Sequence, residues 1–117
     1  MSIVTTICIL LVTLIHIYII ILEMFLWTTR KGRAAFGLKS KEFAEETKVL
    51  ASNQGLYNGF LVAGFIWALV TKDIDIALFF FSCVFVAGLY GSLSTKKVKI
   101  LYIQSIPAAI GLISLFI

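Results

Sequence analysis

The feature that most constrains this chain is a series of long apolar runs separated by short polar segments. The first run covers residues 3–28. As a helix rising about 1.5 Å per residue it would extend over about 39 Å, more than the roughly 30 Å hydrocarbon core of a bilayer. Further runs follow at residues 50–70, 76–94 and 100–117. These lengths predict an all-α integral membrane four-helix bundle, with residues 1–117 as a single transmembrane domain.

The composition favours lipid over water as the main solvent of the chain. Hydrophobic residues make up 61% of it and charged residues 14%, which is more apolar than soluble domains usually are. Helices are favoured over barrel strands because the runs are unbroken and lack the alternating segments of about ten residues that a barrel shows. We expect the first run to be retained, because no Lys or Arg precedes Arg30 and the run is too long for a signal peptide.

The basic residues predict an orientation. All ten Lys and Arg residues except Lys72 lie between the first and second runs or between the third and fourth. The positive-inside rule places these two segments in the cytoplasm, so we expect a multi-pass protein with both termini outside (N-out/C-out). Because Ser40 is a good N-cap residue, we expect the cytoplasmic loop between the first two spans to be partly helical.

The rest of the sequence gives little support for nucleic-acid, metal or cofactor chemistry. The net charge of +4 comes from residues in loops, so we expect no nucleic-acid partner. Cys8 and Cys83 lie in apolar runs without metal-ligand spacing, and we expect neither a metal nor a cofactor. Neither a nucleotide-binding glycine loop nor a Ser-His-Asp arrangement is evident. A non-enzymatic role is favoured over an enzymatic one, and no catalytic residue is assigned.

Polar side chains gather at one depth of the predicted bundle, in its cytoplasmic half. Glu23 lies there in the first span, and His16 precedes it by about two turns on the same helix face. The corresponding part of the second span carries Asn53, Gln54, Tyr57 and Asn58. Ionisable residues inside a membrane are functional candidates by default, so we predict that these six residues bind a ligand. The alternative is that Glu23 is a structural group, bonded to Asn58 or Tyr57 or reaching the nearby interface.

Small residues predict a helix-packing face on the second span. Gly55, Gly59 and Ala63 recur every four residues, a spacing that lets another helix approach closely. We expect the chain to form a homo-oligomer, with this face as a candidate interface.

Several segments resemble a known family. They are His16–Tyr18, Leu22–Phe25, Ala35–Gly37 and, above all, Asn53–Phe60. Over nearly the whole chain they resemble the small bacterial four-span integral membrane proteins classed as a domain of unknown function. This resemblance implies four helices in a bacterial inner (plasma) membrane and no settled activity.

A fainter resemblance is to the membrane-associated eicosanoid and glutathione metabolism family, whose second helix contacts glutathione through Arg, Asn and Glu residues. Asn53 stands about where that Asn would be, although the second span contains no Arg. The likeness implies an alternative function, a glutathione-dependent-type enzyme acting on a lipophilic substrate. Arg30, Arg33 and Lys48 would then attract the carboxylates of the thiol cofactor.

The leading hypothesis is a membrane protein that binds a small molecule or lipid headgroup in a polar pocket of the cytoplasmic leaflet, with a role in transport or membrane homeostasis. Glu23 is its central acceptor, and His16 is a proton site nearer the midplane. A third class is a structural membrane protein that supports a partner complex. The expected partners are the lipid bilayer, further copies of the chain and the small-molecule or lipid ligand.

Overall fold

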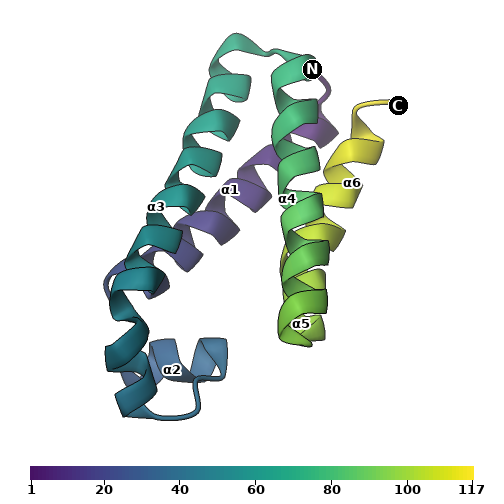
Figure 1. Cartoon of the computed structure of the whole chain (residues 1–117). Coiled ribbons are helices and arrows are strands. Elements are labelled where there is room, and N and C mark those ends of the chain that lie inside the picture. The colour runs from purple at the N-terminus through teal and green to yellow at the C-terminus, as the bar shows by residue number, and fades with distance from the viewer. The chain divides into compact units, whose positions relative to one another are not determined.

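Every regular element of the computed structural model, which describes residues 1–117 in full, is helical (Figure 1). The elements are α1 (Ile3–Met24), α2 (Arg30–Phe36), α3 (Lys41–Thr71), α4 (Ile74–Thr95), α5 (Val98–Ile100), the π-helical turn η1 (Leu101–Ser105) and α6 (Ile106–Ser114). The all-α prediction is therefore confirmed. By length and composition, α1, α3 and α4 are able to cross a membrane, and the last apolar helical segment, Val98–Ser114, is shorter.

Capping, rather than the edge of an apolar run, sets where the helices begin. α3 begins at Lys41, well before the apolar run at residue 50, because the Ser40 hydroxyl accepts a 3.0 Å hydrogen bond from the Phe43 backbone N–H. At α4, the Asp73 carboxylate accepts from the backbone N–H of Asp75 at 2.8 Å. α1 ends at Met24, and the segment that follows contains α2. The loop between the first two long helices is partly helical, as predicted.

The chain divides into two compact units, and the first combines residues 1–15 with residues 61–117. Its core is a cluster of buried apolar side chains that includes Ile9, Phe65 and Phe81. The rings of Phe65 and Phe81 are tilted against each other, with centroids 5.2 Å apart, an arrangement that aromatic pairs prefer. This unit contains all of α4, α5, η1 and α6.

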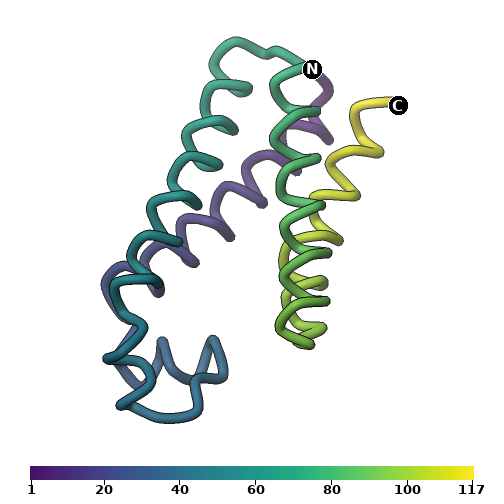
Figure 2. The backbone as a smooth tube through the Cα atoms, viewed as in Figure 1, coloured from purple at the N-terminus to yellow at the C-terminus, as the bar shows by residue number.

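Glycines let the helices of the first unit approach closely. A Cβ atom added to Gly88 of α4 would meet the backbone N of Ser105 at 2.8 Å, and one added to Gly111 of α6 would overlap the Phe81 ring. The Ser105 hydroxyl donates to the Phe85 carbonyl oxygen at 2.9 Å. In Figure 2 the segment from α5 to α6 accordingly runs back beside α4.

Pro107 explains why a π-helical turn interrupts the last helical segment. A proline donates no hydrogen bond, and its ring clashes with the carbonyl group four residues earlier. The Ile106 N–H bonds instead to the Leu101 carbonyl, five residues back, and α6 then begins with Pro107 in its first turn. The proline changes the helix geometry without ending the helix.

The two ends of the first unit meet through hydroxyl side chains. Thr5 Oγ1 and Ser114 Oγ are 2.9 Å apart, and Thr5 Oγ1 also lies 3.3 Å from the Ser114 carbonyl oxygen. Both side chains are buried. The beginning of α1 is therefore held against the end of α6.

The second unit, residues 16–60, contains the end of α1, all of α2 and the first part of α3. α2 is capped at both ends: Thr29 Oγ1 accepts from the Gly32 backbone N–H at 3.2 Å, and Gly37 ends the helix at φ 61°. Glycine adopts this left-handed conformation without a Cβ clash. Gly32 itself packs so closely on the Leu26 carbonyl group that a Cβ would overlap it. These contacts give α2 a defined place within the unit.

Replacing Gly88 by Ala tests the close contact between α4 and η1. We expect Gly88→Ala to destabilise the protein by about 1–3 kcal/mol, because the new methyl group meets backbone that cannot swing away. Thermal unfolding in mild detergent measures the effect. The matched control is Gly91→Ala in the same helix, whose Cβ would meet only the flexible Ile100 side chain at 3.2 Å. Equal melting temperatures for the two variants would contradict this contact.

Candidate functional site

The centre of the candidate site is a buried hydrogen bond between Glu23, in the last turn of α1, and Asn58 of α3. The Asn58 amide Nδ2 donates to Glu23 Oε1 at 2.6 Å, and each residue is 7% exposed. Gly55 lies one turn before Asn58 on the same face of α3. A Cβ atom there would overlap the Met24 side chain and lie 3.4 Å from the Glu23 Cβ. The absent side chain at Gly55 is what lets α3 bring Asn58 to the carboxylate.

The Glu23 carboxylate is only partly satisfied by the protein. Asn58 is the group that donates to it, and this bond reaches Oε1. Oε2 accepts no hydrogen bond from the chain. Oε2 is not among the fully enclosed side-chain atoms that lack a partner, and Glu23 lines a pocket, so this oxygen is open to a donor from outside the protein.

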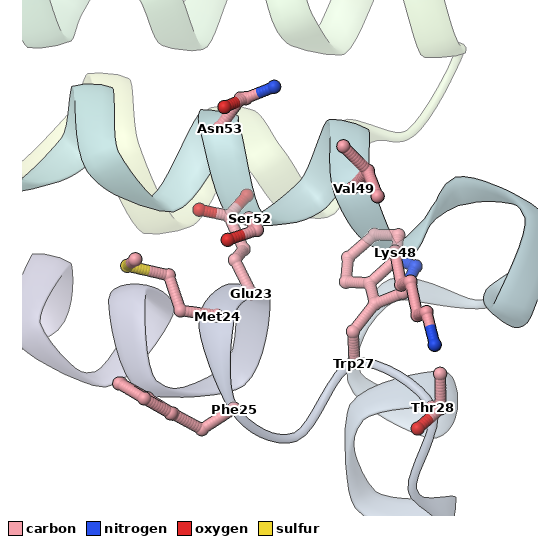
Figure 3. A pocket seen from close by; sticks show the side chains of 9 residues that line it. All are labelled: Glu23, Met24, Phe25, Trp27, Thr28, Lys48, Val49, Ser52 and Asn53. Atoms are coloured by element: carbon pink, nitrogen blue, oxygen red, sulfur yellow. The ribbon is translucent and has the colours of Figure 1, made fainter.

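A pocket of about 380 Å³ opens beside Glu23 between α1 and α3, within the second unit (Figure 3). Its polar lining comes from Glu23, Thr28, Lys48, Ser52 and Asn53, and its apolar lining from Met24, Phe25, Trp27 and Val49. Polar and apolar side chains thus contribute about equally to the wall, which is more polar than that of a usual small-molecule site. In Figure 3 the Glu23 side chain points from α1 toward the turn of α3 that carries Ser52.

Trp27 holds one wall of the pocket in place. Its indole Nε1 donates to Thr47 Oγ1 at 3.0 Å, and the Thr47 hydroxyl donates in turn to the Phe43 carbonyl oxygen at 2.7 Å. The Trp27 ring also packs on Phe36 of α2, with centroids 4.8 Å apart. The segment after α1 is thereby fastened to both α2 and α3.

Lys48 places a positive charge on the lining of the same pocket. Its Nζ lies 3.4 Å from Glu45 Oε2, and both side chains are about half exposed, at 59% and 48%. Exposed ion pairs of this kind contribute little to stability. The Lys48 ammonium can therefore turn from Glu45 to an anionic group in the pocket at small cost.

The structure brings together three of the six predicted ligand-binding residues. Glu23 and Asn58 are bonded to each other, and Asn53 lines the pocket with Glu23. Gln54 and Tyr57 are exposed and do not line it. His16 is fully buried in α1, also outside the lining.

The predicted packing residues of α3 are in different surroundings. Gly55 packs against α1, whereas a Cβ added to Gly59 would meet nothing within 4 Å, and Ala63 is exposed. No group of three or more His, Cys, Asp or Glu side chains is placed to hold a metal ion, and Cys8 and Cys83 are both free thiols.

Sequence reasoning misses much of the pocket wall. Trp27 lies near the end of the first apolar run, where a tryptophan is typical of an anchor at the membrane–water interface. Lys48 is considered only as a charge that attracts the cofactor of the alternative enzyme. Ser52 precedes the recognised polar run by one residue. The signal that would find it is its i, i+4 spacing from Lys48, which predicts a shared helix face.

Comparison with known proteins gives a family and one related protein. The family model described as "Protein of unknown function (DUF1304)" matches residues 10–116. The protein named "Uncharacterized protein YpaA", from Lactococcus lactis subsp. lactis (strain IL1403), is 34% identical over 119 residues, covering 99% of each chain. No solved structure matches.

A double-mutant cycle tests the bond between Asn58 and Glu23. We expect Asn58→Leu to lower the free energy of unfolding by about 1–3 kcal/mol, because it leaves the buried carboxylate without its donor. Adding Glu23→Leu to that variant should recover part of the loss, since both polar partners are then gone. Asn53→Leu, at an exposed position of the same helix, is the control. Additive effects in thermal unfolding would mean that the pair is not coupled.

Proposed function

Because the chain belongs to the DUF1304 family of proteins of unknown function, we propose its role from the site itself: a small multi-pass membrane protein that binds a small molecule or lipid headgroup beside Glu23. The observation that carries this proposal is the buried carboxylate at the pocket. Asn58 donates to one of its oxygens, and the other takes no bond from the chain. A ligand that donates a hydrogen bond or carries a cation would complete the arrangement.

The charges around the pocket narrow the class of ligand. Glu23 supplies a carboxylate and Lys48 an ammonium group on the same lining. A ligand with both a donor or cationic group and an anionic group can meet both. Lipid headgroups and small zwitterions have this pattern, and Trp27 and Phe25 add apolar wall for the remainder of the molecule.

Membrane insertion through four helices is the second part of the proposal. Large apolar side chains are exposed on all three long helices, among them Leu14 at 63%, Val70 at 77% and Phe79 at 62%. Water would disfavour so much exposed apolar surface, and lipid accepts it. The segment Val98–Ser114 would reach about 26 Å along its axis, close to the roughly 30 Å of the hydrocarbon core.

The contact between Thr5 and Ser114 supports an even number of crossings. It holds the beginning of α1 beside the end of α6, as an arrangement with both ends of the bundle on the same side of the membrane requires. Together with the basic segments, this supports both termini outside a bacterial plasma membrane and the Glu23 pocket in the cytoplasmic leaflet. We also propose that the chain is homo-oligomeric, through Gly59 and Ala63 of α3, where the single chain leaves space.

Native mass spectrometry tests ligand binding. We expect the protein released from mild detergent to retain a small molecule that Glu23→Gln binds at least about tenfold more weakly, because a charge-assisted hydrogen bond is replaced by a neutral one. The amide introduced by this substitution can still pair with Asn58, so the fold should persist. Glu46→Gln, at an exposed position of α3, makes the same chemical change away from the pocket. A bound species that is equally abundant in all three proteins would rule out Glu23 as its acceptor.

Thiol labelling in intact cells tests the orientation. In a background lacking Cys8 and Cys83, we expect a membrane-impermeant maleimide to label Ser2→Cys directly. Lys39→Cys should react only after permeabilisation. Both positions are exposed in the structure, so burial does not confuse the result. If only Lys39→Cys is labelled in intact cells, the orientation is the reverse of the one proposed. If both positions are labelled in intact cells, α1 does not cross the membrane, which contradicts four crossings.

A further inference from the structure

The two charged groups that line the Glu23 pocket lie at different levels along α1 and α3. Glu23 in α1 bonds to Asn58 of α3. Trp27, later in the chain, bonds to Thr47, which is earlier in α3, so the two helices are antiparallel here. Lys48 follows Thr47 directly and therefore belongs to the Trp27 end of the pocket, where the chain has already left α1. The carboxylate and the ammonium group thus stand at opposite ends of the lining.

The length of α1 gives this difference a direction. Glu23 is the last residue but one of α1 (Ile3–Met24), and the stretch from Ile3 to Glu23 rises about 30 Å. This is also the approximate thickness of the hydrocarbon core. With α1 across the membrane, Glu23 lies at the edge of that core and Lys48 on its aqueous side. From the membrane toward the water, the order of the charges is therefore negative, then positive.

Two hydroxyl groups on the lining follow the same division. In Figure 3 Thr28 lies with Lys48 at the end of the pocket where the chain has left α1, and the Glu23 side chain points toward the turn of α3 that carries Ser52. Neither the Thr28 nor the Ser52 side chain forms a hydrogen bond within the chain. A hydroxyl group donates as well as accepts. Ser52 can therefore accept from a cation held by Glu23, and Thr28 can donate to an anion held by Lys48.

The order of the charges distinguishes a soluble ligand from a lipid headgroup. In an aminophospholipid the phosphate joins the amine to the acyl chains, so the negative group is the one nearer the hydrocarbon. The pocket has the reverse order. A soluble zwitterion has no acyl chains to direct it and can enter from the aqueous side with its ammonium group first. The volume of about 380 Å³ also lies near the small end of the range for ligand pockets.

We propose that the Glu23 pocket takes a small soluble zwitterion from the aqueous side. Its protonated amine points toward the membrane and donates to Glu23 and Ser52. Its carboxylate or phosphate points toward the water and accepts from Lys48 and Thr28, and the Trp27 ring covers the carbon chain between the two charges. This inference rests on the ligand binding proposed above and selects a soluble small molecule over a lipid headgroup.

Trp27 fluorescence provides a test in the full chain. Trp67 is the other tryptophan and does not line the pocket, so Trp67→Phe leaves Trp27 as the reporter. The protein in mild detergent is titrated with phosphoethanolamine, which carries both charged groups, and with ethanolamine or inorganic phosphate, which carry one each. We expect phosphoethanolamine to bind about fivefold or more tightly than either. Phosphocholine, which has no N–H donor for Glu23, should also bind more weakly.

A lipid titration separates the two sources of the same headgroup. Phosphatidylethanolamine and phosphatidylcholine of the same acyl chains should have equal effects on Trp27, because either lipid presents its phosphate on the wrong side of its amine. A preference for phosphatidylethanolamine that Glu23→Gln abolishes would overturn the proposal in favour of a lipid headgroup. The proposed function would stand in that case.

Substitution of Lys48 tests the aqueous end of the pocket. Lys48→Gln should weaken phosphoethanolamine binding about fivefold, for the loss of one partly exposed charge, and Lys48→Arg should retain it. The melting temperature should change little, because the exposed pair with Glu45 contributes little to stability. The matched control is Lys41→Gln, which removes an exposed lysine of the same helix outside the lining.

Two further results would overturn the proposal. One is an equal loss of phosphoethanolamine binding in Lys48→Gln and Lys41→Gln. The other is the absence of any preference for phosphoethanolamine over ethanolamine, phosphate and phosphocholine. Native mass spectrometry of the wild type and Glu23→Gln still reports whether the pocket retains a molecule, so failure of the soluble zwitterion is distinguishable from failure of the proposed function.

Discussion

The bond between Asn58 and Glu23 determines how the second unit can be built. A carboxylate among apolar helices is costly without donors, so α3 must pass close enough to α1 for a short amide side chain to reach it. That approach is possible because Gly55 leaves room for Met24. The pocket then forms where the two helices end their close contact and the chain turns away after α1, with Trp27 as its fixed wall. The hydrogen bond between Asn58 and Glu23 thus fixes the spacing of α1 and α3, the point where the chain leaves α1, and the carboxylate that lines the pocket.

Apolar run lengths were sufficient to predict an all-α chain, but not where its helices end. α3 begins at Lys41 because Ser40 caps it, and a hydropathy pattern does not contain that information. The candidate site was predictable in part for a similar reason. The sequence placed an acceptor at Glu23 and four polar residues on the next span, Asn53, Gln54, Tyr57 and Asn58, yet consecutive residues lie only about 100° apart around a helix. Which of them faces α1 depends on packing, and the structure selects Asn58 and leaves Tyr57 exposed.

The basic residues near the segment between α1 and α3 are held in different places by the fold, which a count of their charges does not show. The positive-inside rule treats its basic residues as interchangeable. The fold does not, because Gly37 reverses the chain after α2 and Gly32 holds that helix on the Leu26 backbone. Lys48, in the first turns of α3, lines the pocket, whereas Lys31 of α2 lies over the Tyr18 ring. Residues that contribute equally to topology therefore differ in what they can bind.

The division of the chain into a continuous and a discontinuous unit has a consequence for the order of assembly during synthesis. Residues 16–60 are contiguous, so their contacts can form as soon as α3 has been made. The other unit needs both ends of the chain, because Thr5 and Ser114 are separated by 109 positions. Closing such a long loop comes late, since its entropy is lost before its contacts are gained. In a nascent chain the Glu23 pocket would therefore form first. The Thr5 hydroxyl at the beginning of α1 would pair with Ser114 only after α6 had been made.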